Sequence, residues 1–140
     1  MKYNFGMLKG RHVIFRFNKN DRILSVGGTI TKAKQNKNET QFYLDLDRIF
    51  TVKNDVIPHL SIRWNDDSHD SVILCPFIGN NVVSGFVGFT MFDTMGFPVE
   101  LTREILVEKN YWLDTTGFEV LRQLQKEMNS DTFKNKNAFQ

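Results

Sequence analysis

The sequence predicts an α+β fold in which an N-terminal antiparallel β-sheet of about six strands precedes C-terminal α-helices. Residues 1–83 alternate apolar and polar side chains with a period of two and are rich in aromatic and β-branched residues. Residues 84–128 instead carry apolar residues at helical spacing, with helix-capping and helix-ending residues between them. We expect the polar tail, residues 129–140, to be flexible, because Phe133 and Phe139 are isolated there.

Turn-forming residues divide the sheet region. The Gly27-Gly28 pair fits either a two-residue hairpin turn or a bulge in one long bent strand, and we favour the bulge. The run from Val72 to Ile78 is nearly all apolar, which is typical of a central or doubly covered strand. The predicted strands cover residues 3–7, 13–17, 22–31, 40–52, 57–64 and 72–78.

Carboxylates occur at two places in the sheet region. Asp45 and Asp47 share one face of the strand predicted for residues 40–52, where they could serve acid–base chemistry or form its solvated face. We favour the solvated face. Residues 65–71 hold metal-ligand residue types without the spacing of a calcium or zinc site, so a hairpin turn explains them better.

The helical region begins with a helix, a stop and a second helix. Ser84 is the predicted N-cap, and phenylalanines at a spacing of three follow it. Gly96 suits the left-handed position after a helix end, and Pro98 suits the first turn of the next helix. The two helices should therefore meet at a sharp corner.

The second helix should pack through an apolar stripe that contains Leu101 and Ile105, and Asn110 should end it. Asp114 is the predicted cap of a third helix. Its expected packing face consists of Phe118, Leu121, Leu124 and Gln125.

The stretch SGFVGFTMFDTMGFPVELTREILVEKNYWLDTTGFEVL resembles a helical tRNA-recognition segment of alanyl-tRNA synthetases. In that family a Y-D-T-Y-G-F-P-like turn leads into a Leu-Thr-x-Glu-Ile helix and then a Gly-Phe-Glu helix. We find the resemblance over about the last 45 to 50 residues and not before Val83. It implies structural roles for Asp93, Thr94, Gly96 and Pro98, whereas Met95 replaces the usual aromatic residue. Aminoacylation and editing are excluded, because the chain has no room for a class II domain and no His/Cys editing constellation.

The order of a sheet followed by helices also resembles the Thoeris anti-defence sponges of phages. The resemblance implies capture of a cyclic ADP-ribose signal in pockets between subunits, without turnover. We find no catalytic set, metal site or cofactor site in the sequence, so a non-enzymatic protein that sequesters a small nucleotide is the leading hypothesis. An RNA- or tRNA-binding module is the alternative.

Charge and composition limit the class of protein. Residues 1–84 hold 12 Lys and Arg against 8 Asp and Glu, a net charge of +4, and residues 85–140 hold 6 against 8, a net charge of −2. No dense basic block appears, which disfavours extended tracking of a nucleic-acid backbone. The single Cys75, the lack of a signal peptide and the short apolar runs lead us to expect no membrane and a cytoplasmic location, in a host cell if a phage encodes the chain.

An anionic nucleotide needs a planar surface and fixed cationic donors. Arg103 lies early in the second helix, where charge and backbone amides both favour an anion. The open alternative pairs Arg103 with Glu100 on the same helix face. The candidate ligand-binding residues are Arg103, Arg63, Phe77, Asn80 and Asn81.

We expect a homo-oligomer, because local residues cannot bury the tail phenylalanines.

Overall fold

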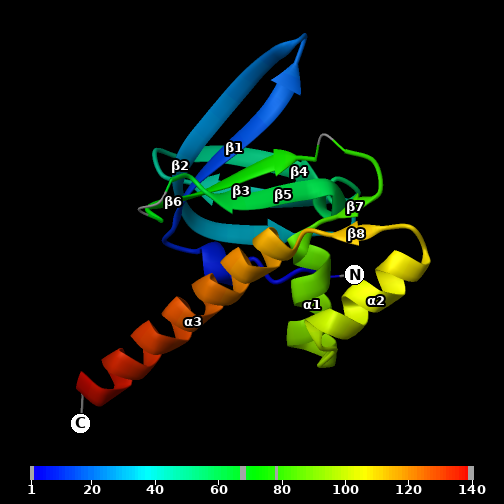
Figure 1. The fold of residues 1–140 in the computed structure, drawn as a ribbon. Helices are drawn as coiled ribbons and strands as arrows, with labels where there is room; N and C mark the ends of the chain where they lie inside the picture. Colours follow the sequence, from blue (N-terminus) through cyan, green and yellow to red (C-terminus); the bar gives the residue numbers. More distant parts are fainter. Residues whose placement is uncertain (1, 67–68, 78, 139–140) are drawn as a thin grey trace.

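The computed structural model describes residues 2–66, 69–77 and 79–138. Figure 1 labels the strands and α-helices. In chain order the elements are η1 (Gly6–Leu8), β1 (His12–Lys19), β2 (Arg22–Gln35), β3 (Glu39–Leu44), β4 (Arg48–Lys53), η2 (Ile57–His59), β5 (Leu60–Trp64), β6 (Ser71–Pro76), β7 (Val82–Val83), α1 (Gly85–Met95), α2 (Val99–Glu108), β8 (Trp112–Leu113) and α3 (Thr115–Ala138).

Within the described residues, six strands form one sheet in the order β4-β3-β2-β1-β6-β5. The α+β class and the strand number are confirmed, but the sheet is mixed rather than wholly antiparallel. β1 and β6 pair in parallel, from His12 opposite Ser71 to Phe15 opposite Leu74. Tight turns force consecutive strands to be antiparallel, whereas β2 to β5 separate β1 from β6 and leave the chain free to return in either direction.

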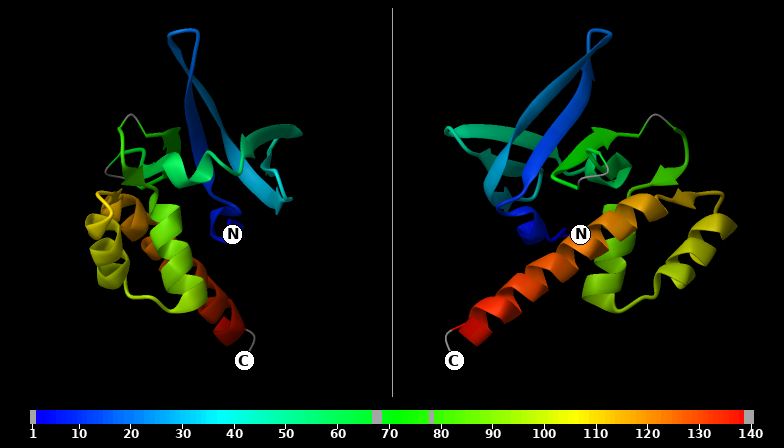
Figure 2. Two further views of the ribbon diagram at one scale, coloured as in Figure 1. Left: turned by 90° about the vertical axis from the view of Figure 1, so that its right-hand side faces the viewer. Right: turned by 60° about the vertical axis from the view of Figure 1, so that its left-hand side comes forward.

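The helices α1, α2 and α3 lie on one side of the sheet, and the β1–β2 hairpin projects from the other side (Figures 1 and 2). A single core of phenylalanine and aliphatic side chains fills the space between sheet and helices. Phe5 from the N-terminal segment packs edge-on against both Phe42 of β3 and Phe86 of α1, at ring-centroid distances of 5.1 and 4.9 Å. The N-terminal segment therefore joins the two layers.

The predicted starts of α1 and α3 and the predicted ends of α1 and α2 are confirmed, whereas α3 runs beyond residue 128 to Ala138. The Ser84 hydroxyl accepts a 3.2 Å hydrogen bond from Phe86 N, and the Asp114 carboxylate accepts one of 3.1 Å from Gly117 N. Gly96 and Asn110 are left-handed, with φ of 71° and 63°. The corner between α1 and α2 is thus the one that the sequence predicts.

Two strand predictions are wrong, and the strand predicted for residues 57–64 is too long, because Ile57–His59 form η2. Residues 3–7 form no strand, because the chain turns into η1 and the Asn4 side chain accepts a hydrogen bond from Gly6 N. Residues 40–52 form the β3–β4 hairpin instead of one strand, since Leu46 and Asp47 adopt φ of 59° and 57° between the two strands. β2 runs through Gly27-Gly28 as one strand, as predicted, but the predicted bulge at these glycines is wrong, because their pairing with β1 is regular and the register shifts between Ile30 and Lys32 instead.

Predictions for the later segments have mixed outcomes. β6 is central and mostly buried, as predicted. The apolar stripe of α2 does not pack as predicted, because Leu101 and Ile105 remain 38% and 43% exposed. α3 extends through the segment expected to be flexible as far as Ala138, and the flexibility of the tail stays a prediction. Across the described chain, no helix is long and apolar enough to cross a bilayer.

Candidate functional site

The N-terminal segment lies along the half of β2 that β1 leaves unpaired. β1 pairs with β2 only as far as Thr29, and beyond it Gly10 N donates to Ile30 O at 2.7 Å. Further along, Tyr3 N donates to the Gln35 side chain at 3.0 Å. These contacts place residues near the N-terminus beside the second half of β2.

Between these two segments lies an open cavity of about 580 Å³. A smaller cavity of about 460 Å³ adjoins it and shares Lys2 and Gln35. We call the two together the lysine groove. Its lining residues are Lys2, Tyr3, Asn4, Phe5, Gly6, Lys9, Lys32, Ala33, Gln35, Asn36, Lys37 and Asn54. The lining thus includes four lysines and no acidic side chain, so its charge favours an anion over a cation.

The floor of the lysine groove is a network of side-chain amides. Asn54 Nδ2 donates to Asn36 O at 2.8 Å, and Asn54 Oδ1 accepts a 2.8 Å hydrogen bond from the buried Thr40 hydroxyl. Gln35 Nε2 lies 3.5 Å from the same Asn54 oxygen. The amides therefore fix the β2–β3 turn that carries Lys37.

Tyr3 forms an aromatic wall of the lysine groove. Its ring packs on Phe5 and Phe86 at centroid distances of 6.2 and 6.3 Å. Burial raises the pKa of the Tyr3 phenol, so at neutral pH the wall is uncharged and can donate a hydrogen bond.

Positively charged residues are concentrated in the N-terminal part of the chain, which forms most of the lysine groove. Residues 2–53 hold 11 Lys and Arg against 4 Asp and Glu, whereas residues 54–84 hold 1 against 4. The sequence shows no basic block because the lysines of the groove are far apart along the chain. Folding brings them together, and nothing in the local pattern could have identified the groove.

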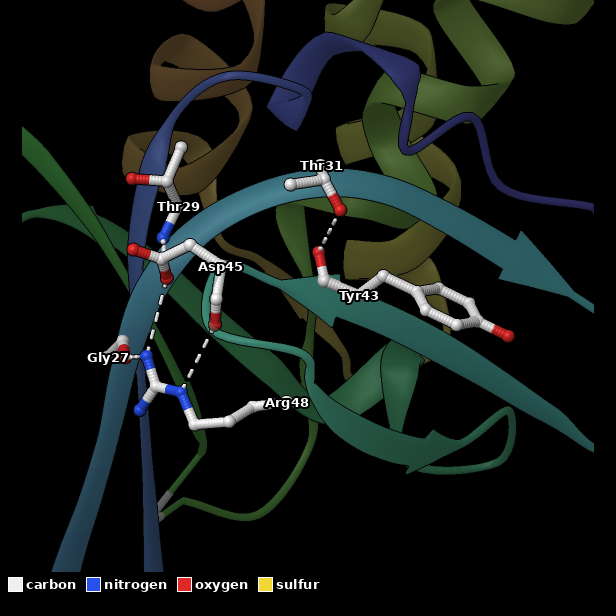
Figure 3. Close-up of polar contacts among 6 residues, drawn as sticks. All are labelled: Gly27, Thr29, Thr31, Tyr43, Asp45 and Arg48. Carbon is white, nitrogen blue, oxygen red and sulfur yellow. Dashed lines mark hydrogen bonds and ion pairs between the residues drawn. The ribbon is translucent and has the colours of Figure 1, made fainter.

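Polar contacts pin the β3–β4 turn onto the bend of β2 (Figure 3). Arg48 donates to Gly27 O at 2.8 Å and lies 3.3 Å from an Asp45 carboxylate oxygen, which accepts from Thr29 N at 3.1 Å. A Cβ on Gly28 would lie 2.8 Å from both charged side chains. Asp45 is therefore a structural residue here, and the predicted shared strand face of Asp45 and Asp47 is wrong.

The predicted ligand-binding residues lie on several elements. Arg103 is exposed on α2, and no ion pair with Glu100 forms within the described chain. Arg63 on β5 donates to the Ser61 hydroxyl at 3.1 Å. Asn81 is left-handed, and its carbonyl accepts a 2.8 Å hydrogen bond from Trp112 N. Phe77, which follows β6, donates its backbone N–H to His59 O at 2.6 Å.

None of these residues, nor the exposed Asn80, lines the lysine groove. Arg63 instead lies beside Asp114. Burial raises the pKa of the Asp114 carboxyl, while the hydrogen bond from Gly117 N, the nearby Ile62 backbone and the Arg63 charge oppose that shift. Arg63 therefore has a local electrostatic role, and its predicted role at a ligand site is untested.

The turn predicted for residues 65–71 falls between β5 and β6, but Ser71 already belongs to β6, and residues 67 and 68 lie outside the described residues. Among the residues that the structure describes, no group of three or more His, Cys, Asp or Glu side chains is placed to hold a metal ion. His69 instead stacks on Trp64 at a centroid distance of 4.5 Å.

Comparison with known proteins identifies part of the chain. The alanine–tRNA ligase of Nostoc punctiforme is 32% identical over 95 residues, or 68% of this chain and 9% of the ligase. That of Buchnera aphidicola from Acyrthosiphon pisum is 40% identical over 63 residues, or 43% of this chain and 7% of the ligase. The ligase of Caldicellulosiruptor saccharolyticus is 51% identical over 47 residues, or 34% of this chain and 5% of the ligase. The chain carries an alanyl-tRNA-synthetase-like segment.

These curated relatives are far longer than the chain, which spans less than a tenth of the length of each of the three ligases. A match covering 68% of the chain must also reach residues before 84, because residues 84–140 number only 57. The expectation that the likeness stops at Val83 is therefore wrong. No family model matches the chain, and no solved structure matches it significantly.

Proposed function

We propose that the protein is a non-enzymatic RNA-binding module whose ligand is tRNA or a tRNA-like RNA, and that the lysine groove receives the phosphate backbone. The observation that carries the proposal is the convergence of four lysines, without an acidic side chain, on one groove. Phosphates gain from such cations through charge and counterion release. The alanyl-tRNA-synthetase-like segment supports tRNA as the RNA class.

The test is equilibrium binding of a tRNA transcript, measured by fluorescence anisotropy over a series of KCl concentrations. We expect the logarithm of the association constant to fall linearly with the logarithm of the salt concentration. The triple variant Lys2→Gln/Lys9→Gln/Lys37→Gln should weaken binding and reduce the magnitude of that slope by roughly 2. Lys109→Gln, at the exposed C-terminal end of α2, is the matched control and should change neither quantity.

If the triple variant bound tRNA with unchanged affinity and an unchanged salt slope, the RNA would bind outside the lysine groove. A complete lack of tRNA binding by the unmodified chain would refute the RNA-binding function. Arg103→Ala belongs in the same series, because it tests whether α2 contributes a contact to the ligand.

A second candidate function is capture of a small nucleotide, which the size of the larger of the two cavities in the lysine groove favours. Small-molecule sites commonly measure ~300–1,000 Å³, and the cavity measures about 580 Å³ with Tyr3 on its wall. In that case a panel of cyclic and linear adenine nucleotides should give binding by calorimetry, with little dependence on salt. Unchanged ligand recovered after heat denaturation would support sequestration without turnover.

A further inference from the structure

A second surface lies next to the lysine groove, on the solvent-facing side of β2 and β3. Lys32 pairs directly opposite Tyr43 in the register of these strands. The ammonium groups of Lys32 and Lys34 lie 4.5 and 5.7 Å from the centre of the Tyr43 ring. We call Tyr43 with these two lysines the tyrosine platform.

An irregularity in β2 creates this arrangement. The register shifts between Ile30 and Lys32, so Thr31 is an extra residue without a partner in the ladder. Ile30 is buried, whereas Thr31 and Lys32 are both exposed, which breaks the in–out alternation of the strand. The bulge thereby turns Lys32 onto the face that carries Tyr43.

Further hydrogen bonds hold the ring in place. The Thr31 hydroxyl donates to Tyr43 O at 3.1 Å, and the Tyr43 hydroxyl donates to Gln41 Oε1 at 3.1 Å. In Figure 3 the ring of Tyr43 extends away from the Asp45–Arg48 contacts that pin the turn. The side chain is partly exposed and is held at its hydroxyl by Gln41, which suits a stacking surface.

We propose that the tyrosine platform binds an unpaired nucleotide of the RNA, with the base stacked on Tyr43 and the adjoining phosphates on Lys32 and Lys34. The inference rests on the proposed RNA-binding function and adds a preference for single-stranded RNA. Base stacking on an aromatic ring is sequence-tolerant and needs an accessible ring face. Each lysine is free to exchange its contact with the ring for one with a phosphate.

Lys32 also connects the platform to the lysine groove, because it lines the groove and lies over Tyr43. An RNA strand can therefore pass from one to the other over β2. Glu39 of β3 lies opposite Lys53 of β4 in the ladder, and Asp45, two residues after Tyr43, pairs with Arg48 at 3.3 Å.

The experiment compares a single-stranded RNA octamer with the same sequence held in a duplex, using anisotropy with the full chain. Tyr43→Leu keeps apolar bulk but removes the aromatic face, so it should weaken binding of the single strand roughly 5- to 150-fold. Tyr43→Phe should stay within about twofold of the parent. Lys32→Gln should lower the magnitude of the salt slope by about 0.7, whereas Tyr43→Leu should leave the slope unchanged.

Ile49→Ala is the matched control, since Ile49 lies opposite Tyr43 on β4 and is 54% exposed. It should leave the affinity unchanged. Equal binding of single strand and duplex, or a Tyr43→Leu variant with parental affinity, would overturn the inference. If the groove variants still weakened tRNA binding, the proposed function would survive that failure.

A measurement on the unsubstituted chain guards against misfolded variants. The chain has three tyrosines, so fluorotyrosine labelling gives three ¹⁹F signals that single Tyr→Phe variants assign. Stacking should shift the Tyr43 signal on addition of the octamer and leave the Tyr111 signal unmoved. An unmoved Tyr43 signal under saturating RNA would also overturn the inference.

Discussion

At position 96 the backbone conformation alone requires glycine. Its φ is 71°, and beyond Gly96 itself and its two chain neighbours no heavy atom lies within 4 Å of the position that a Cβ would occupy. We predict that Gly96→Val lowers the free energy of unfolding by about 1–2 kcal/mol through backbone strain, without a steric clash. Urea denaturation measures this loss. Pro98→Ala should cost less, and an unchanged stability for Gly96→Val would contradict the left-handed turn.

Single residues also mark where sequence reasoning succeeds and fails. Gly96 and Asp114 were predictable because each acts through its own backbone or its own helix end. Leu46 was not, because it takes a left-handed conformation that the sequence gives no reason to expect of an aliphatic residue. The alternation of apolar residues therefore continued through a turn and suggested one strand instead of two.

At the scale of elements, the contact of α1 with α3 depends on Gly85. A Cβ at this position would lie 2.4 Å from Phe118 N and 2.5 Å from the carbonyl carbon of Gly117. Because both are backbone atoms, Gly85→Ala must separate the two helices, and we predict a loss of ~1–3 kcal/mol. Thermal and urea denaturation measure the change.

Gly79→Ala is the control for Gly85→Ala. Its nearest contact would be an ordinary 3.7 Å approach to the Val82 side chain. An equal loss of stability in both variants would show that the packing of α1 on α3 is not the cause.

The N-terminus of α3 should make stability depend on pH. Because burial raises the pKa of the Asp114 carboxyl in the folded state, the folded chain binds the proton more tightly than the unfolded chain. This contribution to stability is complete below the ordinary Asp pKa and is lost as the pH rises through the raised value. Asp114→Asn keeps a capping side chain and should remove this part of the pH dependence.

The measurement is the free energy of unfolding from pH 4 to pH 8 for the parent and the variant. The parent should gain stability relative to Asp114→Asn as the pH falls. Asp47→Asn removes one carboxylate from the exposed β3–β4 turn and controls for the loss of a negative charge. Parallel pH profiles for the parent and Asp114→Asn would contradict the prediction.

The amphipathic pattern of α2 shows a limit of sequence reasoning at this scale. Leu101 and Ile105 lie four residues apart on one helix face, and such a stripe usually packs on the core. Here it stays exposed, because α1 and α3 occupy the space under the sheet. Periodicity predicted the helix correctly but could not identify which surface it contacts.

For the whole molecule, we predict that the chain forms a homo-oligomer through the α2–β8 region. Large apolar side chains are exposed there, with Trp112 at 65% and Ile105 at 43%. A second copy would bury them. The phenylalanines of the tail, on which the sequence-based expectation rested, lie outside the described side chains, so α2 and β8 now carry the prediction.

Sedimentation equilibrium at micromolar concentration tests this prediction. A single species of 16.4 kDa would refute it. Ile105→Ser/Trp112→Ser should dissociate the oligomer, whereas Leu46→Ser, which changes the 84% exposed residue of the β3–β4 turn, should leave it intact.

The lysine groove shows why the candidate site was the hardest feature to predict. Lys2 and Lys37 meet only because the N-terminal segment docks against the free half of β2. Arg103 looked suitable because a helix N-terminus can be identified locally. The order of elements and their caps follow from short-range rules, but a groove between segments about 30 residues apart depends on the docking itself.

The parallel pairing of β1 with β6 determines when the six-stranded sheet can be completed during synthesis. His12 and Ser71 are neighbours in the sheet although 59 residues separate them, whereas β1 to β4 pair through short turns. Closing the long loop costs chain entropy before any contact compensates for it. On the ribosome, the β1–β4 meander can form as it emerges, while the other edge of β1 stays open until β6 follows. During that interval the nascent chain exposes the unpaired backbone of β1, the part of the protein most prone to pair with a neighbouring chain.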